Sequence, residues 1–82
     1  MFHKIKNVEA LKNKILKIEF ENNKIKYYDM KNIIKKYNEF EILNNENIFN
    51  MAKVDKGGYG IIWNDKLDIS GEELYVNGVD NI

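Results

Sequence analysis

The fold is decided by the stretch KILKIEFENNKIKYY, residues 14–28. Charged side chains alternate in it with apolar ones, which recur at every second position, at Leu16, Ile18 and Phe20. This alternation is typical of a half-buried β-strand. The Asn-Asn pair that follows tolerates a left-handed backbone and suits a tight turn, after which apolar residues resume. The stretch therefore predicts a β-hairpin in which residues 14–20 pair with residues 24–28.

The segments on either side of this hairpin predict one more strand and one helix. Upstream, a short strand without a regular period is outlined by Ile5, Val8 and Ala10. Downstream, the spacing changes to that of an amphipathic helix, with apolar residues at Met30, Ile33, Ile34 and Tyr37. Asp29 stands where its carboxylate can accept the free N–H groups of the first helical turn.

The rest of the chain predicts a packed connection over residues 38–50 and a second hairpin, residues 51–55 with 60–63, turned by Lys56-Gly57-Gly58. Ser70 and Glu73 have the spacing of a helix-capping box, and Gly78 can end that helix. The predicted fold class is α+β. It consists of a small, mostly antiparallel sheet built from two hairpins, packed by one main amphipathic helix and followed by a short C-terminal helical turn. We expect a single compact domain over residues 1–82.

Composition excludes several classes of protein. The chain has 82 residues, no cysteine and a net charge of zero, from 13 acidic residues and 13 basic residues that are all lysine. Disulfide scaffolds, thiol nucleophiles and thiolate metal sites are therefore excluded, and no arginine is present for bidentate recognition of guanine or phosphate. No apolar run is long enough to span a bilayer. We expect a cytoplasmic protein that is not an enzyme and uses no cofactor, membrane or small-molecule substrate.

Three groups of residues invite a catalytic or ligand-binding interpretation, but none has the required pattern. Gly57-Gly58-Tyr59-Gly60 precedes a predicted strand and not a long helix, which favours a hairpin turn over a phosphate loop. The carboxylates near the C-terminus lack the spacing of a calcium loop, so no metal site is predicted. His3 and Ser70, the only residues of their types, show no motif of a catalytic triad.

A distinctive order of residues runs from the first hairpin to Tyr75. Its most specific part is a tryptophan that ends a strand, then a short acidic turn, an Asp-Ile-Ser segment and a Leu-Tyr pair: Trp63, Leu67-Asp68-Ile69-Ser70 and Glu73-Leu74-Tyr75. This order resembles the small bacterial family known as domain of unknown function 2442. The resemblance implies a compact α+β domain without an established enzymatic activity. Some members are encoded beside another small protein, as in toxin–antitoxin pairs, and some longer relatives carry a helix-turn-helix segment.

The leading functional hypothesis is a noncatalytic protein-interaction module that inhibits or scaffolds its partner, as an antitoxin or a phage-type inhibitor does. The partner would be another protein, such as a toxin or a nucleic-acid-processing complex. Aromatic residues dominate interface hot spots, and carboxylates can mask a basic surface. We therefore expect the partner-binding surface to comprise the aromatic and acidic residues near the C-terminus: Tyr59, Trp63, Asp65, Asp68, Glu72, Glu73 and Tyr75.

Two alternatives stay open. The first is a small nucleic-acid-binding regulator that uses the lysine-rich helix, through Lys31, Lys35 and Lys36. The second concerns assembly, because a sheet this small leaves edge strands that self-association would cover, which makes a homodimer plausible.

Overall fold

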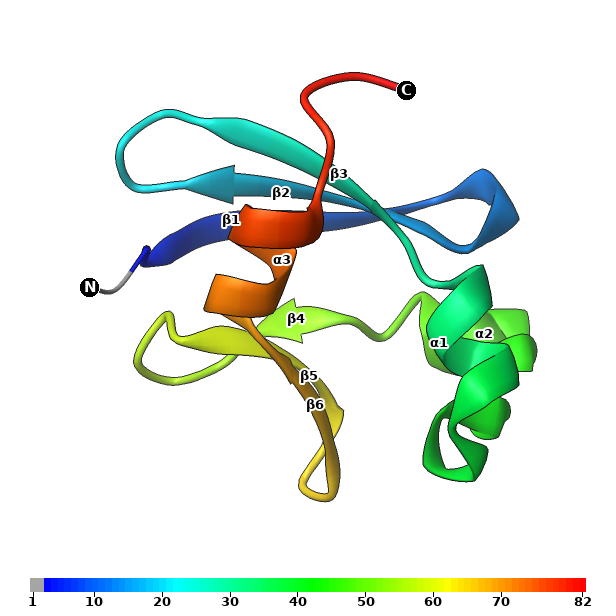
Figure 1. Ribbon diagram of the computed structural model, residues 1–82. Coiled ribbons are helices and arrows are strands. Elements are labelled where there is room, and N and C mark those ends of the chain that lie inside the picture. Colours follow the sequence, from blue (N-terminus) through cyan, green and yellow to red (C-terminus); the bar gives the residue numbers. More distant parts are fainter. Residues whose placement is uncertain (1–2) are drawn as a thin grey trace.

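The computed structural model describes residues 3–82 and shows two small antiparallel sheets joined by a helical segment (Figure 1). The first sheet contains β1 (Ile5–Leu11), β2 (Ile15–Phe20) and β3 (Ile25–Asp29), and the second contains β4 (Lys53–Val54), β5 (Gly60–Asn64) and β6 (Leu67–Ser70). The helical elements are η1 (Lys12–Lys14), α1 (Lys31–Lys36), η2 (Asn38–Asn44), α2 (Glu46–Phe49) and α3 (Gly71–Asn77), of which η1 and η2 are 3-10 helices. The predicted α+β class is confirmed.

The decisive hairpin is confirmed. Leu16 of β2 pairs with Tyr28 of β3, and the turn between the strands places Asn23 in the left-handed region, at φ 70°. β1 pairs with the other side of β2 and contains an irregularity between Ile5 and Asn7. A bulge inserts one residue and shifts the alternation of faces. This explains why Ile5 is buried although it is out of phase with Val8 and Ala10, which pack against the same core.

The second sheet differs from the prediction in one strand. The predicted hairpin is present, with Val54 paired to Ile61, but Leu67–Ser70 also forms a strand, β6, which pairs with β5. The two hairpins thus lie in separate sheets, and the second hairpin has gained a third strand that was not predicted. The signal for β6 was only four residues long, with Leu67 and Ile69 buried and Asp68 and Ser70 exposed between them.

The helical segment between the sheets is fixed by local caps and by buried side chains. The N-cap residue of α1 is Met30, and Asp29, the residue before it, accepts the N–H of Lys31 in the first turn at 2.9 Å through Oδ1, as predicted. The predicted packed connection contains η2 and α2, and Asn45 Oδ1 caps α2 by accepting the N–H of Asn47 at 2.9 Å. Leu43 and Phe49 are fully buried, which anchors both short helices to the core.

One hydrophobic cluster draws on both sheets and all three α-helices. Its largest fully buried members are Phe20, Phe49, Leu16, Ile18, Met30, Leu43, Ile61 and Leu74. α3 packs against β3 of the first sheet and against β5 and β6 of the second, and Figure 1 shows it between them. The predicted cap of α3 is confirmed, because Ser70 Oγ accepts the N–H of Glu73 at 3.1 Å.

Trp63 joins the second sheet to the helical segment. Its side chain is 2% exposed, and its Nε1–H donates to the carbonyl of Phe49 at 3.1 Å. Phe40 of η2 meets the indole edge-on, with ring centroids 6.4 Å apart. Because the bond is buried, replacing the indole removes both a hydrogen bond and packing volume.

We predict that Trp63→Phe lowers the free energy of unfolding by about 2 kcal/mol, from one lost hydrogen bond and a smaller ring in a packed site. Urea unfolding followed by far-UV circular dichroism measures the change. Tyr59→Phe is the matched control, because Tyr59 is 51% exposed and its change should stay within about 0.5 kcal/mol. Equal stability of the two variants would show that Trp63 does not join the elements as described.

Candidate functional site

A groove with a volume of about 600 Å³ runs along β6 and is lined by the exposed aromatic residue Tyr37. One wall consists of α1 and η2, the other consists of β6 and the first turn of α3, and Tyr28 of β3 also contributes. We call it the β6 groove and define it by its lining residues: Tyr28, Asn32, Ile33, Lys36, Tyr37, Phe40, Asp68, Ile69, Ser70 and Glu73.

The side chains of the β6 groove form an apolar wall with polar margins. Tyr37 is 44% exposed, while Ile33 and Phe40 are half-buried and pack against the core. Opposite them, Asp68 and Ser70 of β6 are exposed. An open surface that combines aromatic rings with a polar rim resembles a protein-interaction surface more than an enclosed small-molecule pocket.

Tyr28 and Glu73 form a fixed polar contact in this groove. The Tyr28 hydroxyl donates to Glu73 Oε2 at 2.8 Å. Burial, together with this hydrogen bond to a carboxylate, raises the pKa of Tyr28 well above its ordinary value. The hydrogen bond holds the Glu73 side chain at the groove margin.

A second hollow of about 480 Å³ follows β6 toward the β5–β6 turn, and its lining residues are Glu39, Ile42, Asn64, Asp65, Lys66 and Leu67. Leu67 of this hollow and Asp68 of the β6 groove are consecutive residues, so the two hollows together follow the whole of β6. Their charged side chains are four carboxylates and two lysines, a net charge of −2. The chain as a whole has a net charge of zero, so the acidity is local.

The predicted partner-binding residues do not form one surface. Trp63 is buried and belongs to the core, so the expectation that it would contact a partner is wrong. Asp68 and Glu73 lie in the β6 groove, and Asp65 lines the adjoining hollow. Tyr59 is exposed beside the β4–β5 turn.

The remaining two predicted residues, Glu72 and Tyr75, hold the N-terminal segment against α3. Glu72 Oε1 accepts the backbone N–H of His3 at 2.9 Å and lies 2.8 Å from His3 Nδ1. The His3 ring stacks on Tyr75, with centroids 3.6 Å apart. The hydrogen bond from the His3 side chain lowers the pKa of Glu72 from its ordinary value of 4.5. These contacts are internal and give both residues a structural role.

The lysines of α1 are only partly available as a cationic surface. Lys31 lies 3.0 Å from Asp29 Oδ2 and donates to the carbonyl of Asn13 at 2.8 Å. Lys36 Nζ lies 5.4 Å from the centre of the Tyr37 ring, and Lys35 is exposed. α1 itself has only six residues. A single short helix with one of its cations already paired gives a weak electrostatic footprint for a phosphate backbone.

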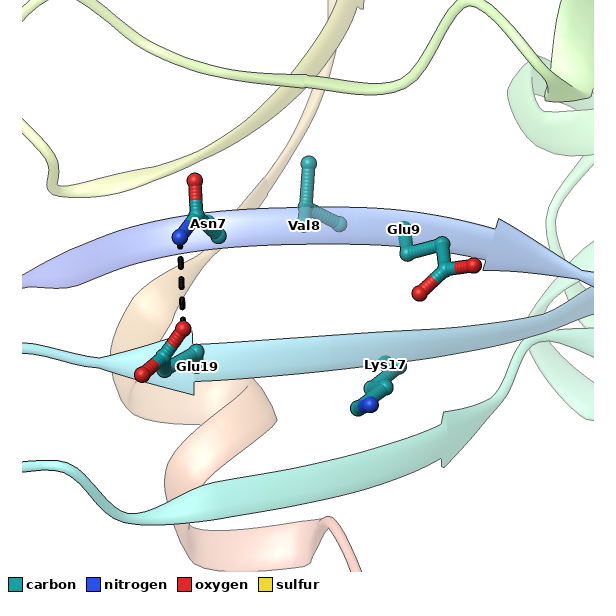
Figure 2. A pocket seen from close by; sticks show the side chains of 5 residues that line it. All are labelled: Asn7, Val8, Glu9, Lys17 and Glu19. Carbon is teal, nitrogen blue, oxygen red and sulfur yellow. Dashed lines mark hydrogen bonds between the residues drawn. The ribbon is translucent and has the colours of Figure 1, made fainter.

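The outer face of the first sheet carries a smaller hollow of about 370 Å³, lined by Asn7, Val8, Glu9, Lys17 and Glu19. Figure 2 shows Asn7 and Glu19 turned toward each other across the strands, where Asn7 Nδ2 donates to Glu19 Oε1 at 3.2 Å. Glu9 lies opposite Lys17 in the strand register. The polar groups are matched within the sheet and no aromatic wall is present among the residues that line the hollow, so this face is a weaker candidate.

The glycine-rich segment is a hairpin turn, as predicted. Gly58 has φ +78°, and Asp55 Oδ1 accepts the N–H groups of Gly57 at 3.1 Å and Tyr59 at 2.8 Å. The Asp55 carboxylate thus occupies the backbone N–H groups that a phosphate loop would direct at its ligand. Within residues 3–82, no three histidine, aspartate or glutamate side chains are grouped as a metal site. No helix in the same range has the length and apolar character needed to cross a membrane.

Comparison with known proteins shows the family. Residues 5–80 match the model of a family described as protein of unknown function (DUF2442). The chain belongs to this family. The resemblance inferred from Trp63, Leu67–Ser70 and the Leu-Tyr pair is therefore confirmed. No curated protein matches this DUF2442 domain.

A solved structure shares the fold of this DUF2442 domain. It is the crystal structure of NE0471 from Nitrosomonas europaea ATCC 19718, named "Putative DNA Binding Protein", with a TM-score of 0.81 at 19% sequence identity. The match covers 93% of this domain and 48% of NE0471, so the domain spans about half the length of that protein. At this identity the likeness shows the fold alone.

Sequence reasoning missed most of the β6 groove in this DUF2442 domain. Its lining residues run from Tyr28 to Glu73 and come from five elements and the residue that ends α1. Tyr37 and Phe40 were interpreted as helix and connection anchors. The sequence showed only that the aromatic residue Tyr37 stands at the end of a short predicted helix. It did not show that β6 lies opposite this residue across the groove.

We predict that Glu72→Gln destabilises the DUF2442 domain more at pH 7 than at pH 3. Because folding lowers the pKa of Glu72, its contribution to stability is complete above about pH 4.5 and is lost as pH falls through the folded-state pKa. Urea midpoints of both proteins at the two pH values measure the difference. In a His3→Ala background, the effect of Glu72→Gln should depend less on pH, because only the backbone N–H of residue 3 still bonds to Glu72. A pH dependence of undiminished size would contradict the assignment to the His3 side chain.

Proposed function

We propose that this DUF2442 domain is a noncatalytic protein-interaction module whose partner binds in the β6 groove. One observation carries the proposal: the groove exposes Tyr37 beside Ile33 and Phe40, and polar groups of β6 and α3 line the opposite side. Interface energy concentrates in aromatic anchors that sit in a pocket with a polar rim. The groove has this composition, and its open shape suits a protein segment.

A binding role is favoured over catalysis because the side chains that could act as a nucleophile or a base are already engaged in internal hydrogen bonds. The Ser70 hydroxyl accepts a backbone N–H at the start of α3, and His3 is bonded to Glu72. The Tyr28 hydroxyl already donates to Glu73. We therefore infer that the domain acts on its partner by occupying a surface, which inhibits the partner or scaffolds a complex.

The charge of the β6 groove favours a partner with a basic protein surface. The two hollows along β6 carry a net charge of −2, which attracts cations and repels phosphate. An antitoxin-like or inhibitor-like role fits this charge, because a toxin or a nucleic-acid-processing complex presents cations to its own polyanionic ligand.

We predict that Tyr37→Ala weakens partner binding and that Tyr59→Ala does not. Both residues are exposed tyrosines, but only Tyr37 lines the β6 groove. Loss of an aromatic anchor typically costs more than about 1 kcal/mol, which weakens binding at least about fivefold. Affinity capture from the native host with the wild-type chain and both variants, quantified by mass spectrometry, measures this. Equal recovery of the same partner by the wild-type chain and Tyr37→Ala would contradict the proposal.

The alternative function is nucleic-acid binding, and it would use the lysines of α1 instead of the β6 groove. NE0471, which shares the fold, is named "Putative DNA Binding Protein", although the domain covers only about half of that protein. We predict no mobility shift of a DNA or RNA probe at low salt, because Lys31 is paired with Asp29 and α1 has only six residues. A salt-sensitive shift that is lost in a Lys31→Glu, Lys35→Glu, Lys36→Glu variant would establish the alternative and overturn our proposal.

A further inference from the structure

β6 is an edge strand whose backbone is directed into the β6 groove. The second sheet has the order β4–β5–β6, so β6 has a strand on one side only. Its other side lies along the groove, where Asp68, Ile69 and Ser70 all contribute to the lining. An edge strand presents unpaired N–H and C=O groups to any extended chain that approaches it.

The ladder pattern identifies which backbone groups face outward. The Asp55 N–H donates to the carbonyl of Gly60 at 2.9 Å, so the backbone of Gly60 is directed at the β4 side. The Gly71 N–H donates to the carbonyl of Tyr59 at 2.7 Å, on the β6 side. Because the direction alternates along a strand, Ile69 is directed at β5, whereas Asp68 and Ser70 direct their backbone groups away from it.

Two other sheet edges in the described part of the chain are partly covered by the chain itself. Tyr27 of β3 exchanges two hydrogen bonds with Val79, both 2.8 Å long, so the C-terminal segment lies along that edge. At the start of β1, the Ile5 N–H donates to the carbonyl of Gly58 at 2.8 Å, and β1 packs beside β4. The outer edge of β6 faces a groove instead.

We propose that the β6 groove binds its partner by strand addition: an extended, basic peptide segment pairs with the outer edge of β6. The peptide backbone would bond to the N–H and C=O of Asp68 and to the N–H of Ser70. This inference rests on the proposed function, since it specifies how the same groove holds its partner. Strand addition obtains affinity from the backbone and specificity from alternate side chains.

The walls of the groove define what the peptide side chains meet. In an added strand, every second side chain points to the inner face of the sheet. On that face lies Phe40, which contacts Trp63 of β5, with Ile33 and Tyr28 beside it. Inward positions of the peptide therefore favour β-branched or aromatic residues.

The charge along β6 favours basic residues in the peptide, and Asp68 favours them at the outward positions. Glu39, Asp65, Asp68 and Glu73 outnumber Lys36 and Lys66 in the two hollows. Asp68 is exposed on the strand itself. A peptide that alternates lysine or arginine with apolar residues complements both features, whereas an acidic peptide meets like charge.

A phage-displayed library of random dodecapeptides, selected on the full wild-type chain and counter-selected on Tyr37→Ala, tests the occupant directly. We expect enriched sequences to alternate basic with β-branched or aromatic residues and to lack proline in the paired part. Enrichment of acidic or proline-rich sequences, or no enrichment over the counter-selected pool, would overturn the inference.

A synthetic peptide with the enriched sequence then tests the backbone contact. Asp68→Pro removes the outward N–H and no ladder bond, because proline is tolerated where an edge N–H faces out. We expect it to weaken binding at least about tenfold, whereas Asp68→Asn, which keeps the N–H and loses only the charge, should weaken it about two- to fivefold. Equal affinity of Asp68→Pro and Asp68→Asn would overturn strand addition.

Amide hydrogen exchange of the wild-type chain gives a readout that does not depend on the folding of any variant. The N–H groups of Asp68 and Ser70 should become protected when the peptide binds, and unchanged exchange at both would overturn the inference. If Asp68→Pro leaves binding intact while Tyr37→Ala removes it, strand addition is wrong and the proposed function stands. If neither variant affects binding, the β6 groove is not the site and both fail.

Discussion

The burial of Trp63 is the constraint on which the rest of the structure depends. Each sheet has only three strands and needs a second layer to cover its apolar face. Trp63 fills the space between the second sheet and the helical segment, and its bond to the carbonyl of Phe49 fixes α2 against β5. Phe40 rests on the edge of the same indole. The aromatic wall of the β6 groove is thus positioned by the core, which makes the groove a preformed feature.

The parts of the fold that the sequence predicted are those with strong local patterns. The alternation over residues 14–28, the caps formed by Asp29 and Ser70 and the Gly57-Gly58 turn were all found where expected. β6 was missed because four residues give only two apolar positions, and a following capping box favoured a helix. The irregular period near Ile5 has its cause in a bulge, which cannot be recognised until the partner strand is known.

The candidate site was predicted less well, for a physical reason. An aromatic residue has the same identity in a core and in an interface, and only tertiary packing decides which of them it occupies. Trp63 was expected at the surface and is buried, whereas Tyr37 was expected in a helix stripe and is exposed in the groove. Charge was more informative: the acidic C-terminal region supplies Asp65, Asp68 and Glu73 along β6. The remaining acidic residue of that prediction, Glu72, is bonded to His3.

This DUF2442 domain is proposed to act through the β6 groove. Site-specific photocross-linking in the native host tests that claim most directly, with benzoylphenylalanine introduced in place of Tyr37 in one strain and of Tyr59 in another. Both positions are exposed, so both probes can react with a neighbouring protein. The account predicts a discrete covalent adduct with one partner protein from position 37 and none from position 59. An adduct from position 59 alone would contradict it.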